Sequence, residues 1–98
     1  MTTIDNNTQP TLRLTVNRVA VLNTLRASLR EVKAFTAGPA RSVQQYNYWR
    51  AYSDGVVATA KRLAGFVGPD DEQVAALVED LIEARHQVHT HSRIMAAH

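Results

Sequence analysis

The fold is decided by the stretch from residue 68 to residue 97, which reads GPDDEQVAALVEDLIEARHQVHTHSRIMAA. Its apolar residues recur three and four positions apart, which is the spacing of one face of an α-helix. They are Val74, Leu77, Val78, Leu81, Ile82, Val88 and Met95. A Gly-Pro pair precedes the stripe, and Asp70, with Gln73 three positions later, is expected to cap the first turn. We therefore predict a helix over about residues 70–97.

The same spacing occurs twice upstream, on either side of a second break at Ala37-Gly38-Pro39. The first stripe contains Leu22, Leu25, Leu29 and Val32, and the second contains Val43, Tyr46, Trp49, Ser53, Val56, Ala60, Leu63 and Val67. Ser42 is expected to cap the second helix. Gly55 lies inside that helix, where it indicates close packing or a kink. The sequence therefore predicts an all-α fold, an elongated three-helix antiparallel bundle.

The N-terminal residues divide into two parts. Residues 1–10 have no apolar periodicity, so we expect a disordered arm there and a single helical-bundle domain over residues 11–98. Residues 11–16 alternate polar and apolar side chains, which is typical of a strand but also fits the first turns of a long helix. We favour the helix, because the chain offers no second strand to pair with and a strand here would need a partner chain.

The amino-acid composition excludes several classes of function. The chain has no cysteine, which excludes disulfides, thiolate zinc sites and thiol nucleophiles. It also has no glycine-rich phosphate loop and no Gly-x-Ser-x-Gly elbow, so we expect no cofactor and no enzymatic activity. No apolar run is long enough for a membrane helix, and the polar start carries Asp5. We therefore expect a cytoplasmic protein that does not associate with membranes.

Charge is distributed unevenly along the chain. Residues 1–68 hold nine Lys/Arg and three Asp/Glu, a net charge of +6, whereas residues 69–98 hold two Arg and six Asp/Glu, a net charge of −4. This asymmetry fits a protein that binds a polyanion or associates with itself. The alternative is local, because Asp70, Asp71 and Glu72 lie where acidic side chains stabilise the start of a helix.

Two groups of residues are candidates for partner binding. Arg26, Arg30 and Lys33 share one face of the first helix and are expected to contact an acidic surface of a partner or of another copy. In the second helix, Tyr46 and Trp49 are expected to point into the core. Tyr48 and Tyr52 form a pair one turn apart that is expected to be exposed, with Arg50 near it. Such composition is typical of interfaces, although a neighbouring helix could also cover the tyrosines.

All four histidines lie in the last thirteen residues of the sequence. Glu83 and His86 form a Glu-x-x-His pair, and His89 follows one turn later, so these three residues are weak candidates for a metal site. The alternative is that the histidines are solvated near the end of a helix, where positive charge is favoured. We expect no metal.

The segment of alternating residues, followed by a helix, Gly38, Arg41-Ser42-Val43 and another helix, is similar to ribbon-helix-helix repressors. This resemblance implies that two chains form a two-stranded ribbon that enters the major groove of DNA. The base-facing side chains would be Thr11, Arg13 and Thr15, and the core-facing ones would be Leu12, Leu14 and Val16.

Arg85-His86-x4-His91 resembles the Arg-polar-x-His motif of HEPN-type ribonucleases and their antitoxin relatives, which are small all-helical dimers. The resemblance implies that Arg and His face each other across a dimer and act on a phosphodiester.

Taken together, these patterns favour a small non-catalytic helical protein that binds another macromolecule, first of all another protein, as an adaptor, inhibitor, regulator or assembly factor. We expect a homodimer, because narrow bundles often complete their core by dimerising. One alternative is a nucleic-acid-binding regulator or antitoxin that uses the basic first segment. Another is a metal-binding or HEPN-like ribonuclease that uses the histidine-rich end.

Overall fold

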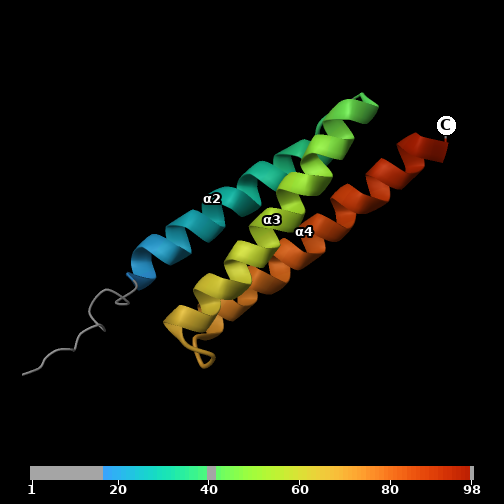
Figure 1. Ribbon diagram of the computed structural model, residues 1–98. Coiled ribbons are helices and arrows are strands. Elements are labelled where there is room, and N and C mark those ends of the chain that lie inside the picture. Colours follow the sequence, from blue (N-terminus) through green and yellow to red (C-terminus); the bar gives the residue numbers. More distant parts are fainter. Residues whose placement is uncertain (1–16, 40–41, 98) are drawn as a thin grey trace, which may run out of the picture.

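The structure is a computed structural model that describes residues 17–39 and 42–97, with side chains as far as Ile94. Its secondary structure consists of α2 (Arg18–Ala37), α3 (Val43–Val67) and α4 (Glu72–Ala97) (Figure 1), with no strand in the described ranges. Helix α3 runs antiparallel to α2 and α4. The predicted elongated three-helix antiparallel bundle is therefore confirmed. The predicted arm over residues 1–10, and the strand-or-helix alternative over residues 11–16, lie outside the described residues.

Local capping explains where the first two of these helices begin. The side chain of Asn17 accepts a hydrogen bond from the backbone N–H of Ala20 at 3.1 Å and caps α2, which begins at Arg18. Ser42 caps α3 as predicted, in a full capping box. Its hydroxyl accepts from the N–H of Gln45, whose side chain accepts from the N–H of Ser42.

The cap predicted for the third helix is wrong by one residue. Asp71, not Asp70, accepts the backbone N–H of Val74, at 3.1 Å. Gly68 adopts a positive φ of 129°, and its carbonyl accepts the N–H of Asp71, so residues 68–71 form a turn before the helix begins. Either aspartate can cap a helix, and Gln73 favours Asp70 in the sequence, but the turn places Asp71 at the cap.

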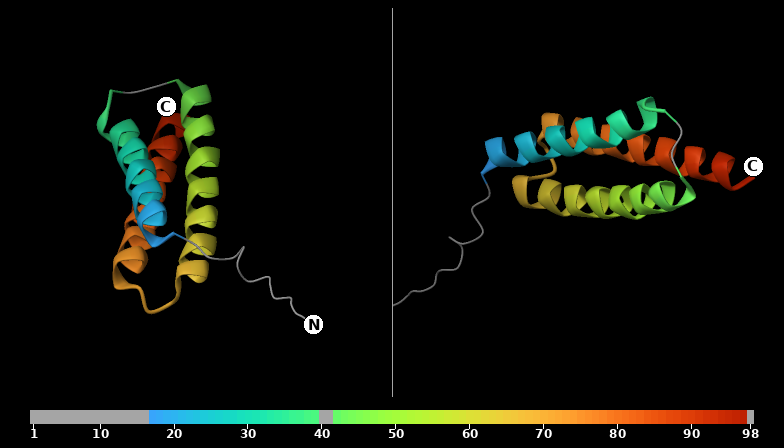
Figure 2. Two further views of the ribbon diagram at one scale, coloured as in Figure 1. Left: turned by 90° about the vertical axis from the view of Figure 1, so that its left-hand side faces the viewer. Right: turned by 90° about the horizontal axis from the view of Figure 1, so that it is seen from above.

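The core has two parts, and α4 contributes to both. One part contains Val21, Leu22, Leu25, Val57, Ala60, Val74, Val78 and Leu81, and the other contains Val32, Phe35, Tyr46, Ala84 and Val88. Leu29 packs against both parts. Helix α4 lies between α2 and α3 (Figure 2) and packs closely on each of them, whereas α2 and α3 make few contacts with each other.

The stripe predicted for α3 needs three corrections. Val57 is only 2% exposed although Val56 was expected in its place, and Val43 is 51% exposed because it lies on the flank of the first turn. A Cβ added at Gly55 would meet no atom within 4 Å, so this glycine is not required by close packing. Gly55 instead borders an open groove. Separately, none of the described helices is long and apolar enough to cross a membrane.

An ion pair fastens the starts of α2 and α4 together. The guanidinium of Arg18 donates to both carboxylate oxygens of Asp71 and to the side-chain oxygen of Gln73. The hydrogen bond from Arg18 is the largest cause that lowers the pKa of Asp71 below its usual range, and the N–H of Val74 adds to it. The ionised carboxylate therefore stabilises the folded chain.

We predict that Asp71→Asn lowers the melting temperature at pH 7 and has a smaller effect at pH 3. Asparagine can still cap the helix through its amide oxygen, so the substitution removes the charge and one of the two oxygens that accept from Arg18. Because the folded pKa of Asp71 is lowered, its stabilisation is complete above the unfolded pKa of about 4 and is lost as the pH falls through the folded value. Thermal melts of both proteins at the two pH values test this, and an unchanged difference at low pH would contradict it.

Candidate functional site

Five aromatic rings form a continuous cluster where α3 begins beside the end of α2. Phe35 stacks on Trp49 with ring centroids 5.0 Å apart and contacts Tyr46 edge-on at 5.2 Å. Tyr48 and Tyr52 are stacked at 6.1 Å, and each contacts Trp49 edge-on. The rings therefore continue from the core at Tyr46 to the surface at Tyr48.

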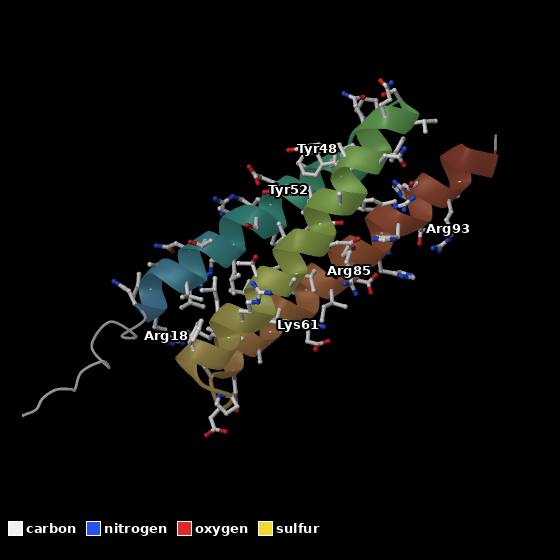
Figure 3. The ribbon with its side chains drawn as sticks, viewed as in Figure 1. Arg18, Tyr48, Tyr52, Lys61, Arg85 and Arg93 are labelled. Carbon is white, nitrogen blue, oxygen red and sulfur yellow. The ribbon has the colours of Figure 1, made fainter. Side chains whose placement is uncertain are left out.

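The exposed fractions of these aromatic side chains largely agree with the positions predicted for them from the sequence. Tyr46 is 7% exposed, so its predicted place in the core is confirmed, and Trp49 is half-buried. Tyr48 is 62% exposed, as predicted, whereas Tyr52 is half-buried. Figure 3 shows Tyr48 and Tyr52 on the side of α3 that faces α2. The role of these two tyrosines in binding stays a prediction.

A hydrogen bond explains why Tyr52 is partly covered. Its hydroxyl donates to a carboxylate oxygen of Glu31 on α2, at 2.6 Å. This bond is the main cause that raises the pKa of Tyr52 above its usual value, with partial burial contributing in the same direction. Tyr52 and Glu31 thus bridge the two helices that otherwise contact each other least.

An apolar groove of about 370 Å³ runs between α2 and α3, next to this bridge. Leu25, Val56, Ala60 and Leu63 are among its apolar lining residues. Small side chains make up most of the remainder, namely Thr24, Ser28, Ala51, Gly55 and Thr59. Ala51, Gly55 and Thr59 recur every four residues, a pattern in the sequence that could have revealed the groove.

Arg50 is separated from the tyrosines by the geometry of the helix. At about 100° per residue, Arg50 lies about 160° around α3 from both Tyr48 and Tyr52. Its side chain is exposed and belongs to the flank that carries Asp54, which faces α4. The predicted combination of two tyrosines and one arginine therefore does not form a single patch.

The basic residues predicted on the first helix are all exposed, and one of them, Lys33, borders acidic residues of its own chain. Lys33 borders a groove between α2 and α4 together with Asp80 and Glu83. Arg26 and Arg30 lie on the same flank of α2 and are exposed to solvent. Contact of this flank with another macromolecule stays a prediction.

The histidine-rich end of α4 is divided between two grooves. His86 and His89 line a groove against α3 with Arg85, whereas His91 lines the groove against α2. Within one chain, the Arg85 and His91 of the HEPN resemblance therefore lie in different grooves. His89 Nε2 lies 2.8 Å from a carboxylate oxygen of Asp54, a residue 35 positions away that no local pattern connects to it.

Two of the three residues considered for a metal have hydrogen-bond partners within the protein. A carboxylate oxygen of Glu83 accepts a hydrogen bond from Gln87 at 2.9 Å, while His89 faces Asp54. Among the described residues, no three His, Asp or Glu side chains are grouped closely enough to hold a metal ion. Glu83, His86 and His89 therefore line one groove without forming a set of metal ligands.

Comparison of the chain with protein-family models, with curated proteins and with solved structures found no match. The function proposed below therefore rests on the geometry of the three helices.

We predict that Tyr46→Ala and Tyr48→Ala have opposite consequences for folding, although the residues are two positions apart. Truncation of the buried Tyr46 should lower the free energy of unfolding by about 3 kcal/mol, because it leaves a cavity beside Phe35. Truncation of the exposed Tyr48 should cost less than about 1 kcal/mol. Urea unfolding of both variants measures the difference, and a larger loss for Tyr48→Ala would show that it is a core residue.

Proposed function

We propose that this chain is a non-catalytic protein that works by macromolecular association, and that its first partner is a second copy of itself. The supporting observation is the face of α3 that borders the open α2/α3 groove. On this face Tyr48, Gly55 and Phe66 lie within about 20° of one another around the helix. Tyr48 is 62% exposed and Phe66 is 59% exposed, so large apolar surface lies at both ends and a glycine lies between them.

The order of side chains on this face is complementary to itself. Tyr48 and Phe66 lie nine positions on either side of residue 57, and Gly55 and Thr59 lie two positions on either side. In an antiparallel pair of α3 helices with a two-fold axis at residue 57, each Tyr48 meets the Phe66 end of the other copy. The small residues meet at the centre, where they allow the helices to approach closely. Such an isologous contact closes as a dimer.

The charged residues of α3 lie away from the centre of this contact. Between Tyr48 and Thr59, the Lys, Arg, Asp and Glu residues of α3 are Arg50 and Asp54, and both belong to the opposite flank. Arg62 lies about 40° to one side of the direction of Tyr48 and Phe66, so it stays at the edge of the contact. The dimer therefore buries no charge near its centre.

The dimer leaves other surfaces available for further partners. The flank of α2 that carries Arg26 and Arg30 lies away from the α2/α3 groove, so each copy still presents it to solvent. An exposed basic flank of this kind fits the acidic surface of another protein. We therefore place the protein among adaptors, regulators, inhibitors and assembly factors rather than enzymes.

A charge exchange tests the dimer directly. Tyr48→Glu and Phe66→Lys should each weaken dimerisation at least tenfold, because each buries an unpaired charge against an apolar side chain of the other copy. The double variant places Glu opposite Lys in both symmetric contacts and should recover part of the lost affinity. Within one chain, Phe66 lies eighteen positions from Tyr48 along α3, about 27 Å away, so a contact inside the monomer does not explain such recovery. Sedimentation equilibrium measures the dissociation constants.

Two glycines in α3 provide a matched steric control. Gly55 lies on the proposed face and Gly65 lies about 80° away from it, and an added Cβ meets no atom within 4 Å at either position. Gly55→Leu should block dimerisation, whereas Gly65→Leu should leave it within twofold, and both changes favour the helix. A wild-type protein that is monomeric at tens of micromolar, or charge variants without recovery, would overturn the proposal.

A further inference from the structure

A polar groove runs between α3 and α4, on the flank of α3 opposite the proposed dimer face. It has a volume of about 560 Å³ and is lined by Asp54, Ile82, Glu83, Arg85, His86, His89 and Arg93. Two arginines and two histidines thus converge on one groove. Figure 3 shows Arg85 and Arg93 along the side of the bundle away from Tyr48 and Tyr52, with Lys61 on α3 nearby.

The carboxylates of this groove already have partners within the protein. Asp54 lies 2.8 Å from the imidazole of His89, and Glu83 accepts a hydrogen bond from Gln87 at 2.9 Å. Glu83 also borders the groove on the other side of α4, so its charge is shared between two surfaces. Both carboxylates line the groove, but neither lies within ion-pair distance of Arg85 or Arg93.

Arg85 is the residue of this groove that most directly indicates the kind of ligand it binds. It interrupts the apolar stripe of α4, and its side chain is half-buried. Within residues 17–39 and 42–97, no carboxylate lies within ion-pair distance of Arg85. The planar fork of donors of a guanidinium suits a phosphate or carboxylate. An anionic ligand can therefore reach Arg85 without displacing a carboxylate of the protein.

The cationic groups form a row rather than a single cluster. Arg85, His89 and Arg93 occupy successive turns of α4, about 6 Å apart along the axis. Because Asp54 meets His89 in antiparallel helices, Arg50, one turn before Asp54, lies at the level of Arg93. The row extends for about 12 Å between Arg85 and Arg93, which is longer than one oxyanion.

We propose that the α3/α4 groove binds a ligand with several phosphate groups, which Arg85 and Arg93 hold through their guanidinium forks. His86 lines the groove beside Arg85, and its imidazole provides a further hydrogen-bonding group. The backbone of a nucleic acid and an inorganic polyphosphate both present this chemistry. The site differs from the basic flank of α2, and it lies on the side of α3 that dimerisation leaves open.

The test is a titration of fluorescein-labelled single-stranded DNA of 20 nucleotides with the full chain, followed by anisotropy, and of unlabelled tripolyphosphate by calorimetry. Arg85→Gln/Arg93→Gln should weaken binding of the probe at least tenfold. It should also make the slope of log K against log salt less steep by about 1 to 2 units. Arg26→Gln/Arg30→Gln removes the same charge from α2 and should change binding less than twofold.

The two probes distinguish the source of the phosphate groups. Binding of DNA without binding of tripolyphosphate supports a nucleic acid, and tight binding of tripolyphosphate that displaces DNA supports a small polyphosphate. Equal weakening by the two double variants would overturn the proposal, since any loss of positive charge would then suffice. It would also be overturned if neither probe bound at millimolar concentration. The dimer of the proposed function can be present or absent in either case, because its face is separate.

Discussion

Helix α4 carries the packing of the whole bundle, because α2 and α3 each bury their apolar stripe against it and bury little against each other. Val74, Leu81 and Val88 lie along this shared surface, and each is at most 1% exposed. A helix that packs against two neighbours needs a wide apolar stripe. Val78 and Ala84 widen this stripe on the two sides of the line through Val74, Leu81 and Val88. The positions of α2 and α3 thus follow mainly from α4.

This arrangement leaves the seam between α2 and α3 incompletely filled. At one end, the rings of Phe35, Trp49 and Tyr52 span the seam, and the Tyr52–Glu31 hydrogen bond joins the two helices. At the other end the side chains are too small to do so, and the groove that borders Gly55 stays open. An additional helix can cover this open and weakly charged face of α3. The two-fold order of side chains along α3 favours the α3 helix of a second copy as that additional helix.

Local patterns in the sequence were sufficient to predict the helices but not the contacts between them. The stripe of α4 and the cap at Ser42 depend on residues a few positions apart, so periodicity predicts them. The capping box of Asp70 and Gln73 gave the wrong cap, because the turn at residues 68–71 decides which aspartate reaches the backbone N–H of Val74. The Asp54–His89 contact joins residues 35 positions apart, and it depends on the register of two antiparallel helices. The groove that Arg85 lines depends on the same register, so it too is visible only in the structure.

Distances between spin labels in the assembled protein test the central claim, which is the antiparallel pairing of α3 about residue 57. The chain has no cysteine, so single cysteines at Ala58 and at Gln44, both exposed, can be labelled without further changes. The separation along the helix axis grows by about 3 Å for each position away from residue 57. Double electron–electron resonance should therefore give about 39 Å between labels at residue 44, and a distance too short for the method at residue 58. Short distances at both positions, or no dipolar coupling at either, would contradict the account.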